Sequence, residues 1–310
     1  MSDPVRPPEP ATEGATAVPD GARPRRARRT LTQVFLIRLW KNKLALFGAI
    51  WLILATVTIV AAPLLPLPSP TRIDVSNTFA PPSSEHLLGT DENGRDVLAR
   101  LIAGGRVSIL VGLTAAVLTV VIGGLLGVLA GYFGGLVDRV IMRFTDGILS
   151  IPVFFLLLAV VALFGSTITV LILALSLTRW MGPARLLRGE VLRVKEMEFT
   201  TAAQALGAGH LRIMFTHLLP QAMPSLIVAT SIGVGNVMLV EAGLSFLGLG
   251  ISPPTPSWGN MLTASQFYMW SAPQLAVYPG IMILLSVMAF NTLGDVIRDA
   301  LDPRLRSSGD

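Results

Sequence analysis

Few side chains in this sequence are of the kinds that perform chemistry, and their spacing argues against an active site. The chain has no cysteine and three histidines, so disulfides and cysteine-based zinc or iron sites are excluded. His210 and His217 lie beside a glycine break, and we interpret them as polar contacts at an interface rather than as metal ligands. There is no Ser-His-Asp order and no paired His-Glu spacing, so the sequence predicts neither a catalytic centre nor a metal site.

Two acidic residues and an asparagine lie within or beside long apolar runs and are candidates for a transport pathway or gate. A charged side chain at the centre of a membrane helix costs roughly 2.5 to 3.5 kcal/mol on insertion scales, which draws attention to Glu241 and Asp146. Glu241 either lines a cavity or is a structural acid, and both interpretations stay open. Asp146 is nearer a water boundary, which favours a structural role. Asn236 is better suited to a hydrogen bond between helices than to a substrate contact.

The elements that must position these residues are predicted to be membrane helices. Of 310 residues, 52% are hydrophobic and 14% are charged, which leaves too little polar sequence to cover a soluble core. A helix needs about 20 mostly apolar residues to cross the hydrocarbon layer. Six windows qualify, so the expected fold class is all-α and integral to a membrane, with six transmembrane helices. The windows are 44–62, 107–129, 144–164, 167–180, 223–244 and 275–293.

The distribution of basic residues predicts the orientation and argues against a nucleic-acid partner. The connections on the side of the N-terminus hold 20 of the 24 lysines and arginines, and the opposite connections hold four. By the positive-inside rule, both termini are expected in the cytoplasm. The first 30 residues lack the apolar core of a cleavable signal peptide. We expect a disordered cytoplasmic tail over residues 1–34 and a short cytoplasmic tail over residues 301–310.

Between the tails, the sequence divides into two regions. Residues 35–106 are expected to hold the first transmembrane helix and an outer loop, with an amphipathic helix that Thr90 or Asp91 caps. Residues 107–300 are expected to form the core of the other five spans. An uncharged outer loop between the last two spans carries Trp258 and Trp270, which we interpret as anchors at the membrane interface.

Three glycines in the second span recur every four residues. Gly123, Gly127 and Gly131 therefore lie on one stripe of a helix. Small residues allow helix backbones to approach closely in lipid, so the stripe favours a close helix contact. The alternative is that the glycines are merely tolerated in a membrane helix.

The connection after the fourth span contains a short half-polar segment, residues 199–220. Its first part is good helix sequence, Gly207-Ala208-Gly209 breaks it, and a second turn or two runs to Pro220. A unit this short cannot bury its own apolar side, which includes Ala202, Ala203 and Leu206 as well as Ile213, Met214 and Phe215. We therefore expect it to dock into a groove of another protein on the cytoplasmic side.

Several stretches together resemble the membrane subunits of bacterial ATP-binding-cassette (ABC) importers, and in particular the DppC/OppC type of the dipeptide/oligopeptide permease family. They are HLLGTDENGRDVLARLIAGGRVSILVG, AGYFGGLVDRVIMRFTDGILSIP, EAGLSFLGLGISPPTPSWGNML and GDVIRDALDPRLR, together with the two alanines, glycine and Leu-Pro of the 199–220 segment. The resemblance covers roughly residues 35–308. The family's glutamate is replaced by Thr201, a residue that can cap a helix.

The resemblance implies a type I ABC importer permease fold with a cytoplasmic coupling helix between spans 4 and 5. It implies a sibling permease of the DppB/OppB type, one or two cytoplasmic ATPase subunits that carry ATP and Mg, and an extracytoplasmic substrate-binding protein. The chain has no G-x-x-x-x-G-K-[ST] phosphate loop, and the resemblance implies that it binds no cofactor itself and is not an enzyme. The ATPase contact is assigned to Thr201, Ala202, Ala203, Leu206, Gly207, Ile213, Phe215, Leu219 and Pro220.

Two alternatives remain for the function. A nickel or other small-solute permease of the same family has similar motifs. A self-sufficient transporter coupled to protons through Glu241 or Asp146 is the alternative of a different class, but the sequence offers no inverted pair of broken helices. The resemblance therefore implies a multi-pass permease for peptides in the cytoplasmic membrane of a bacterium, working by alternating access.

Overall fold

The computed structural model describes residues 30–301, and the regular elements within this range are all helices. Residues 1–29 and 302–310, which include most of the two expected tails, lie outside the described residues. The contacts between residues separate the chain into two units, one that ends at Thr30 and a helical one that begins at Leu31. Its first helix, α1 (Leu31–Lys41), already starts inside the range expected to be a tail.

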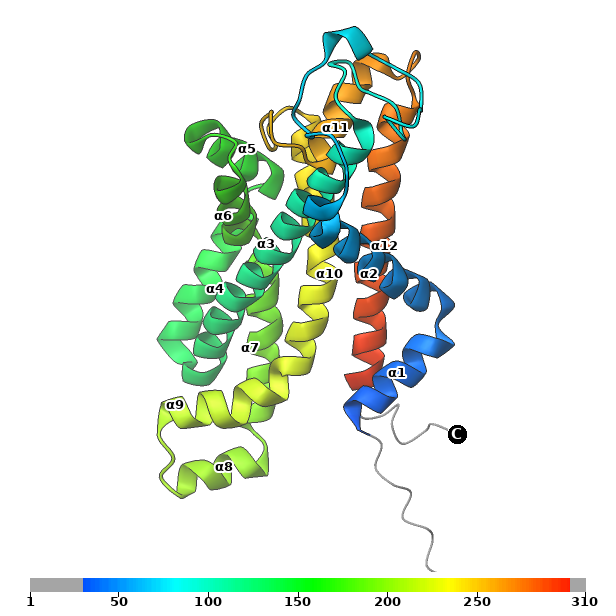
Figure 1. Ribbon diagram of the computed structural model, residues 1–310. Helices are drawn as coiled ribbons and strands as arrows, with labels where there is room; N and C mark the ends of the chain where they lie inside the picture. The colour runs from blue at the N-terminus through cyan, green and yellow to red at the C-terminus, as the bar shows by residue number, and fades with distance from the viewer. Residues whose placement is uncertain (1–29, 302–310) are drawn as a thin grey trace, which may run out of the picture. The chain divides into compact units, whose positions relative to one another are not determined.

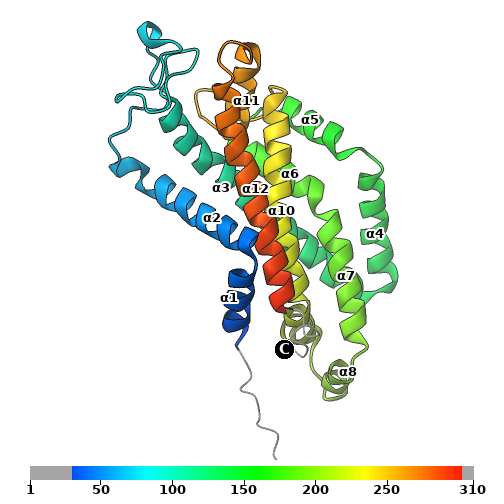
Figure 2. The same cartoon turned by 90° about the vertical axis from the view of Figure 1, so that its right-hand side faces the viewer.

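Four helices are long and apolar enough to cross a membrane within the described residues. They are α2 (Lys43–Ala61), α3 (Val97–Phe133), α10 (Leu219–Phe246) and α12 (Gln274–Leu301). They contain the first, second, fifth and sixth expected windows. α10 and α12 lie side by side in both views, and α3 packs against α10 (Figures 1 and 2).

The third and fourth expected spans are broken. The third consists of α4 (Gly135–Leu149) and α5 (Val153–Phe164), which are bent by 84°. The prediction of one helix over 144–164 is therefore wrong, because Pro152 lacks an N–H and disfavours helical backbone at the residue before it. The fourth span consists of α6 (Ile168–Arg179) and α7 (Met181–Lys195), bent by 43°. The described chain thus has four spans, or up to six if each bent pair is one span.

The glycine stripe of α3 faces α7. A Cβ atom added at Gly123 would lie 2.4 Å from the carbonyl oxygen of Trp180, and one at Gly127 would lie 2.5 Å from that of Ala184. At Gly131 it would lie 2.9 Å from Cβ of Val191. The two backbones therefore approach so closely that no side chain fits between them, and α3 packs along α7 more extensively than along any other described element.

The long α3 helix begins at the outer loop rather than after a separate amphipathic helix. Asp96 is its N-cap and accepts a hydrogen bond of 2.7 Å from the backbone N–H of Ala99. The expected cap at Thr90 or Asp91 is wrong, because the Asp91 carboxylate instead binds Arg95 and Arg100. At about 1.5 Å per residue, the 37 residues of α3 extend about 55 Å, which exceeds the hydrocarbon layer.

The outer loop also contains an exposed acid with a shifted pKa. The hydroxyl of Ser76 and the amide of Asn77 donate hydrogen bonds to Asp74 and hold the pKa of this carboxyl below its usual value. Because these donors favour the ionised form, they stabilise the folded loop at any pH above the ordinary pKa of aspartate. This stabilisation is lost as the pH falls through the lower pKa that Asp74 has in the folded loop.

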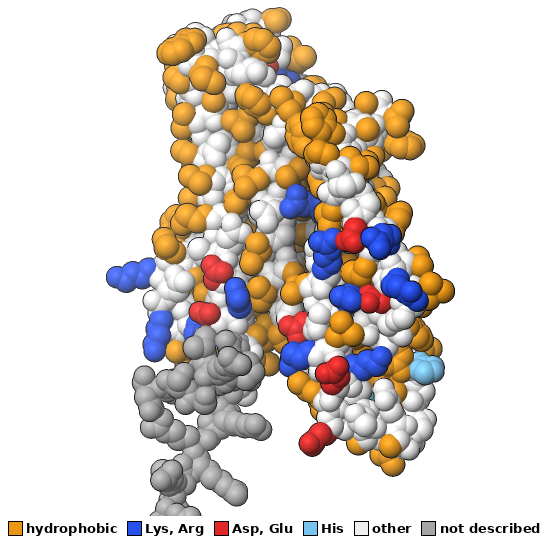
Figure 3. Space-filling model, turned by 180° about the vertical axis from the view of Figure 1, so that it is seen from behind, with side chains coloured by type: hydrophobic (Ala, Val, Ile, Leu, Met, Phe, Trp, Pro, Cys, Tyr) orange, Lys and Arg blue, Asp and Glu red, His pale blue; other side chains and the backbone are white. Residues whose placement is uncertain are grey.

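Charged side chains gather toward one end of the molecule. On the face shown in Figure 3, the Lys, Arg, Asp and Glu side chains lie mainly in the lower half, the half that contains α8 (Glu198–Ala205) in Figure 1. Arg188 of α7 forms a bidentate pair with Asp138 of α4, and Arg185 pairs with Asp146. These pairs join α4 and α7 beside a region that is mainly apolar.

Candidate functional site

The segment predicted to dock into a partner is a helical hairpin at the charged end of the molecule. It consists of α8, a turn, the short helix α9 (His210–Arg212) and the π-helical turn η3 (Ile213–Leu218) (Figure 1). We call residues 198–218 the α8–η3 segment. α8 ends at a turn in which Gly207 has φ +79°, a left-handed conformation that favours glycine.

Two local details differ from the sequence-based expectations. Thr201 does not cap a helix, because Met197 is the N-cap of α8 and Thr201 lies inside its first turns. Pro220 does not end a helix either, since helical backbone continues from His210 to Phe246. Proline lacks a backbone N–H and is tolerated in the first turn of α10, directly after η3.

The inner side of the α8–η3 segment is buried within the chain itself. Ile213 and Met214 are 1% and 3% exposed and pack with Leu187 and Val191 of α7 and Tyr132 of α3. The expectation that Ile213 and Met214 contact a partner is therefore wrong, because α3 and α7 already cover them. Likewise, the half-buried Leu219 packs against this same cluster.

Hydrogen bonds fix this inner side to α3 and α7. The Tyr132 hydroxyl at the end of α3 lies 2.7 Å from Nδ1 of His210 in α9. The Tyr132 carbonyl accepts a hydrogen bond of 2.6 Å from the Lys195 ammonium, which joins α3 to α7 beside this contact. The buried Thr200 hydroxyl donates to the Val194 carbonyl at 2.9 Å. His210 thus contacts the chain's own Tyr132. The segment is thus anchored through both α8 and α9.

The outer side of the α8–η3 segment carries exposed apolar side chains. Leu206 is 88% exposed, Leu211 69% and Phe215 51%. Thr201, Ala202 and Gly207 are also exposed, and Ala203 is half-buried. Leu211 was missed by the sequence reasoning, although its place between the glycine break and Phe215 could have indicated it.

The three candidate pathway residues do not form one site. Glu241 of α10 is 1% exposed and accepts hydrogen bonds from the hydroxyls of Ser245 (2.8 Å) and Ser257 (3.2 Å). Asp146 is exposed and paired with Arg185 on α7, and Asn236 lies on an exposed face of α10. Among the residues that the structure describes, no group of three His, Cys, Asp or Glu side chains could hold a metal ion.

Comparison with known proteins identifies the family. The family model of the binding-protein-dependent transport system inner membrane component matches residues 123–307. The N-terminal TM domain of oligopeptide transport permease C matches residues 30–82. The chain belongs to the binding-protein-dependent transport system inner membrane components. It is therefore a multi-pass membrane permease of the ABC transporter class, as its helices and motifs indicate.

Individual relatives agree with this family. The dipeptide transport system permease protein DppC of Alkalihalophilus pseudofirmus is 39% identical over 87% of this chain and 89% of its own length. The oligopeptide transport system permease protein OppC of Bacillus subtilis is 36% identical over 87% and 89%. The nickel transport system permease protein NikC of Escherichia coli is 38% identical over 87% and 97%. The DppC/OppC resemblance is confirmed.

The fold likewise agrees with a solved transporter. A chain of the MetNI methionine ABC transporter in an inward-facing conformation superposes with a TM-score of 0.52 at 20% identity, covering 66% of this chain and 97% of that chain. The likeness concerns the fold alone. It confirms the all-helical ABC importer permease fold that the motifs implied.

Proposed function

We propose that this chain is the permease subunit of an ATP-driven importer that moves dipeptides and oligopeptides across the cytoplasmic membrane of a bacterium by alternating access. The observation that carries the proposal is the α8–η3 segment, whose inner side is buried and whose outer side is apolar and exposed. The chain has no phosphate-binding loop of its own. A separate ATPase subunit with ATP and Mg therefore supplies the energy, and this chain performs no catalysis.

The proposed ATPase contact is the outer side of the α8–η3 segment. The exposed residues of the sequence prediction remain in it, Leu211 joins them, and the covered Ile213 and Leu219 leave it. The contact then consists of Thr201, Ala202, Ala203, Leu206, Gly207, Leu211 and Phe215, with the exposed Pro220 at its edge. This is the helix-in-groove mode, in which an apolar helix face enters a hydrophobic cleft of the partner.

The anchored inner side explains how movement of the ATPases reaches the membrane helices. A force on α8 acts through the Thr200 hydroxyl on Val194 of α7, and a force on α9 acts through His210 on Tyr132 of α3. α3 and α7 move together because glycines hold their backbones in contact. ATP binding closes the ATPase pair and thereby reorients these helices. Because the coupling is reciprocal, occupancy of the outer side of the permease biases nucleotide binding in return.

The topology completes the proposal. Counting each bent pair as one span gives six spans, with the α8–η3 segment in the cytoplasm between the fourth and fifth. Both termini then lie in the cytoplasm, on the side with 20 of the 24 lysines and arginines. A sibling permease completes the pore, and an extracytoplasmic binding protein delivers the cargo.

Peptides are the proposed cargo because relatives from several bacteria are named for dipeptide or oligopeptide transport. Nickel is the second candidate, because the similarity to a nickel permease is of the same size. Uptake of labelled dipeptide and of labelled nickel by cells that express the whole transporter separates them. Competition by unlabelled dipeptide but not by nickel supports the peptide assignment, and the reverse result contradicts it.

Copurification tests the ATPase contact. Leu206→Asp places a charge on the most exposed leucine of the α8–η3 segment, and we expect it to abolish copurification of the ATPase and uptake while membrane insertion persists. The matched control is Leu87→Asp, because Leu87 is 59% exposed in the outer loop. Full ATPase recovery with Leu206→Asp contradicts the proposed contact.

A further inference from the structure

One face of α1 is fixed to the last turns of α12. Leu39 is 9% exposed and packs with Val296 of α12. The Arg38 guanidinium lies 3.7 Å from the Asp299 carboxylate. α12 carries no charged residue before Asp295, so this contact lies where a spanning helix leaves the hydrocarbon layer. α1 is therefore held at a membrane boundary, at the end of α12 that lies away from the outer loop (Figures 1 and 2).

The other face of α1 is apolar and exposed. Leu36, Ile37 and Trp40 are 50%, 37% and 70% exposed. They share one face because residues three and four apart lie together on a helix. The exposed apolar surface continues on α2 with Leu44 and Phe47, and α2 is the least buried of the four long spans. α1 thus extends the surface of a spanning helix to the membrane boundary, where an amphipathic helix contacts both acyl chains and headgroups.

Trp40 is exposed at this boundary, whereas a tryptophan expected to anchor the outer end is not. Trp258 of α11 (Trp258–Ser265) is 2% exposed and donates its indole N–H to the Leu101 carbonyl of α3 at 2.8 Å. The interpretation of Trp258 as an interface anchor is therefore wrong, because its ring fills the space between α11 and α3. Tryptophan favours a membrane interface since its ring is apolar and its N–H needs a polar partner. The exposed Trp40 fits this preference.

Two exposed lysines flank the break between α1 and α2. Lys41 ends α1 and Lys43 begins α2, and no ion pair among the described residues includes either of them. The Asn42 side chain between them accepts hydrogen bonds of 3.1 Å from the N–H groups of Leu44 and Ala45, which fixes the break. The first turn of α2 contains no acidic residue, although a helix N-terminus favours negative charge. An external anion is therefore stabilised here by two ammonium groups and by the helix end.

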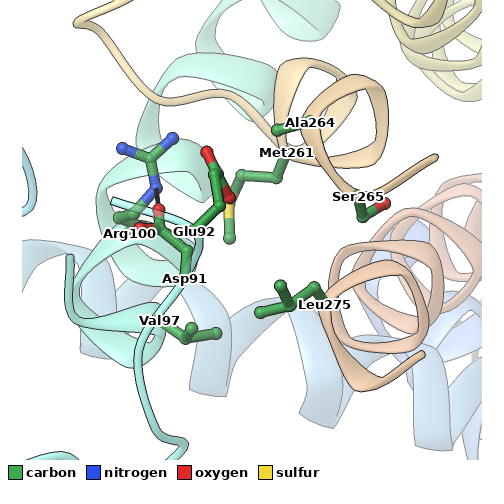
Figure 4. Close-up of a pocket in the computed structure, with 8 residues that line it drawn as sticks. All are labelled: Asp91, Glu92, Val97, Arg100, Met261, Ala264, Ser265 and Leu275. Atoms are coloured by element: carbon green, nitrogen blue, oxygen red, sulfur yellow. Dashed lines mark ion pairs between the residues drawn. The ribbon is translucent and has the colours of Figure 1, made fainter. Parts of the chain in front are cut away.

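The arginines near the outer loop, in contrast, are satisfied within the chain. Figure 4 shows Arg100 beside Asp91 and Glu92 at the wall of a small pocket. The Nε atom of Arg100 lies 3.2 Å from the Asp91 carboxylate, and Arg95 pairs with both acids at 2.8 Å. Arg95 and Arg100 are 8% and 5% exposed. These arginines offer no surface to an external anion, whereas the exposed lysines of the α1–α2 break do.

We propose that the α1–α2 break is a binding site for an anionic phospholipid. Lys41 and Lys43 bind the phosphate of the headgroup. The exposed apolar face of α1, with Trp40 near its end, contacts the acyl chains. A protein partner would have to bring both acids and an apolar groove to the membrane boundary, whereas an anionic phospholipid supplies a negative headgroup and apolar chains in one molecule. The bound lipid holds α1 and, through the contacts of α1, the last turns of α12.

Titration of the purified, assembled transporter with lipid tests the site. Native mass spectrometry measures the binding of dioleoyl phosphatidylglycerol, which is anionic, and in parallel of dioleoyl phosphatidylcholine, which has no net charge. One basic residue near an anionic surface contributes about a fivefold factor in affinity, so Lys41→Gln combined with Lys43→Gln should weaken the binding of phosphatidylglycerol about 20- to 30-fold. Binding of phosphatidylcholine should stay the same. Arginine at both positions retains the affinity, and the control Arg72→Gln, at an exposed cation of the outer loop, leaves it unchanged.

Further measurements separate the charged part of the site from the apolar part. Added salt weakens the binding of phosphatidylglycerol to the natural chain, because exposed charges are screened, and has little effect on the double glutamine variant. Trp40→Ala weakens the binding of both lipids to the same extent, because it removes apolar contact area and no charge. Excess inorganic phosphate does not displace phosphatidylglycerol, since free phosphate lacks acyl chains.

An unchanged affinity of the double glutamine variant for phosphatidylglycerol overturns the site. Displacement of the lipid by inorganic phosphate also overturns it, because the acyl chains then contribute nothing. If the variant instead loses a partner subunit while lipid binding persists, the surface is a protein contact and the proposal is wrong. Lipid binding requires neither ATP nor cargo. A result against the site is therefore distinguishable from failure of the proposed function, which uptake and copurification measure.

Discussion

The contact between α3 and α7 allows a stability prediction with a matched control in the same pair of helices. A Cβ atom at Gly127 would lie 2.5 Å from the carbonyl oxygen of Ala184, whereas ordinary contact begins at 3.4 Å. The overlap of about 0.9 Å involves backbone atoms, which no rotamer change relieves, so Gly127→Ala forces the helices apart. Overpacking of this kind costs about 1–3 kcal/mol.

The control is Gly189→Ala on α7. Gly189 is helical and exposed, and a Cβ atom there would meet nothing within 4 Å. Both substitutions gain about 1 kcal/mol of helix propensity. The difference in stability between the two variants therefore isolates the cost of overpacking at Gly127, about 1–3 kcal/mol. Since 1 kcal/mol corresponds to roughly 2–4 °C in a chain of this size, Gly127→Ala should unfold about 2–12 °C below Gly189→Ala.

The assay is thermal unfolding of the purified complex in nanodiscs, followed by tryptophan fluorescence and by retention in the soluble fraction. The order of the two midpoints matters more than their absolute values, because partner subunits stabilise both variants equally. Equal midpoints, or a higher midpoint for Gly127→Ala, refute the reasoning that these glycines are needed for the α3–α7 contact.

Three further predictions concern side chains held by hydrogen bonds. Tyr132→Phe removes the bond to His210 and weakens docking of the α8–η3 segment onto α3 by about 0.5–1.5 kcal/mol. We expect faster hydrogen exchange in α8, and a transporter that still hydrolyses ATP but takes up less substrate. Asp96→Ala removes the N-cap of α3 and lowers stability by about 1 kcal/mol, measurable as a lower unfolding midpoint, while Asp96→Asn retains most of it. Because hydrogen bonds lower the pKa of Asp74, hydrogen exchange in the outer loop should stay slow as the pH falls past the usual aspartate range and accelerate only below it. Asp74→Asn should remove that acid-dependent step.

Local patterns were sufficient to predict much of the fold. The apolar windows located the long helices because the bilayer imposes a length and a composition on any spanning helix. The four-residue spacing of Gly123, Gly127 and Gly131 indicated a close helix contact, and these glycines lie against α7. The glycine break after α8 was visible because the left-handed conformation of Gly207 has a residue preference.

Features that depend on tertiary contacts were not predictable in this way. The break in the run over 144–164 was itself predictable from Pro152, but the 84° angle between α4 and α5 depends on tertiary packing that composition does not show. Ile213 and Phe215 have similar local patterns, yet α7 covers the first and leaves the second exposed. Of the two serines that bond Glu241, Ser245 is one helical turn away and follows from helix spacing, whereas Ser257 lies sixteen residues on, beyond a loop whose path no spacing rule gives.

The most direct test of the account is a crosslink from the tip of the α8–η3 segment. Leu206→Cys introduces a single thiol into a cysteine-free chain at a residue that is 88% exposed. In native membranes, with Leu87→Cys as the outer-loop control, the account predicts a crosslink from position 206 to the ATPase subunit whose yield changes with bound nucleotide. A thiol at position 206 that reacts only with water-soluble reagents or lipid, in membranes that still take up peptide, contradicts the central claim.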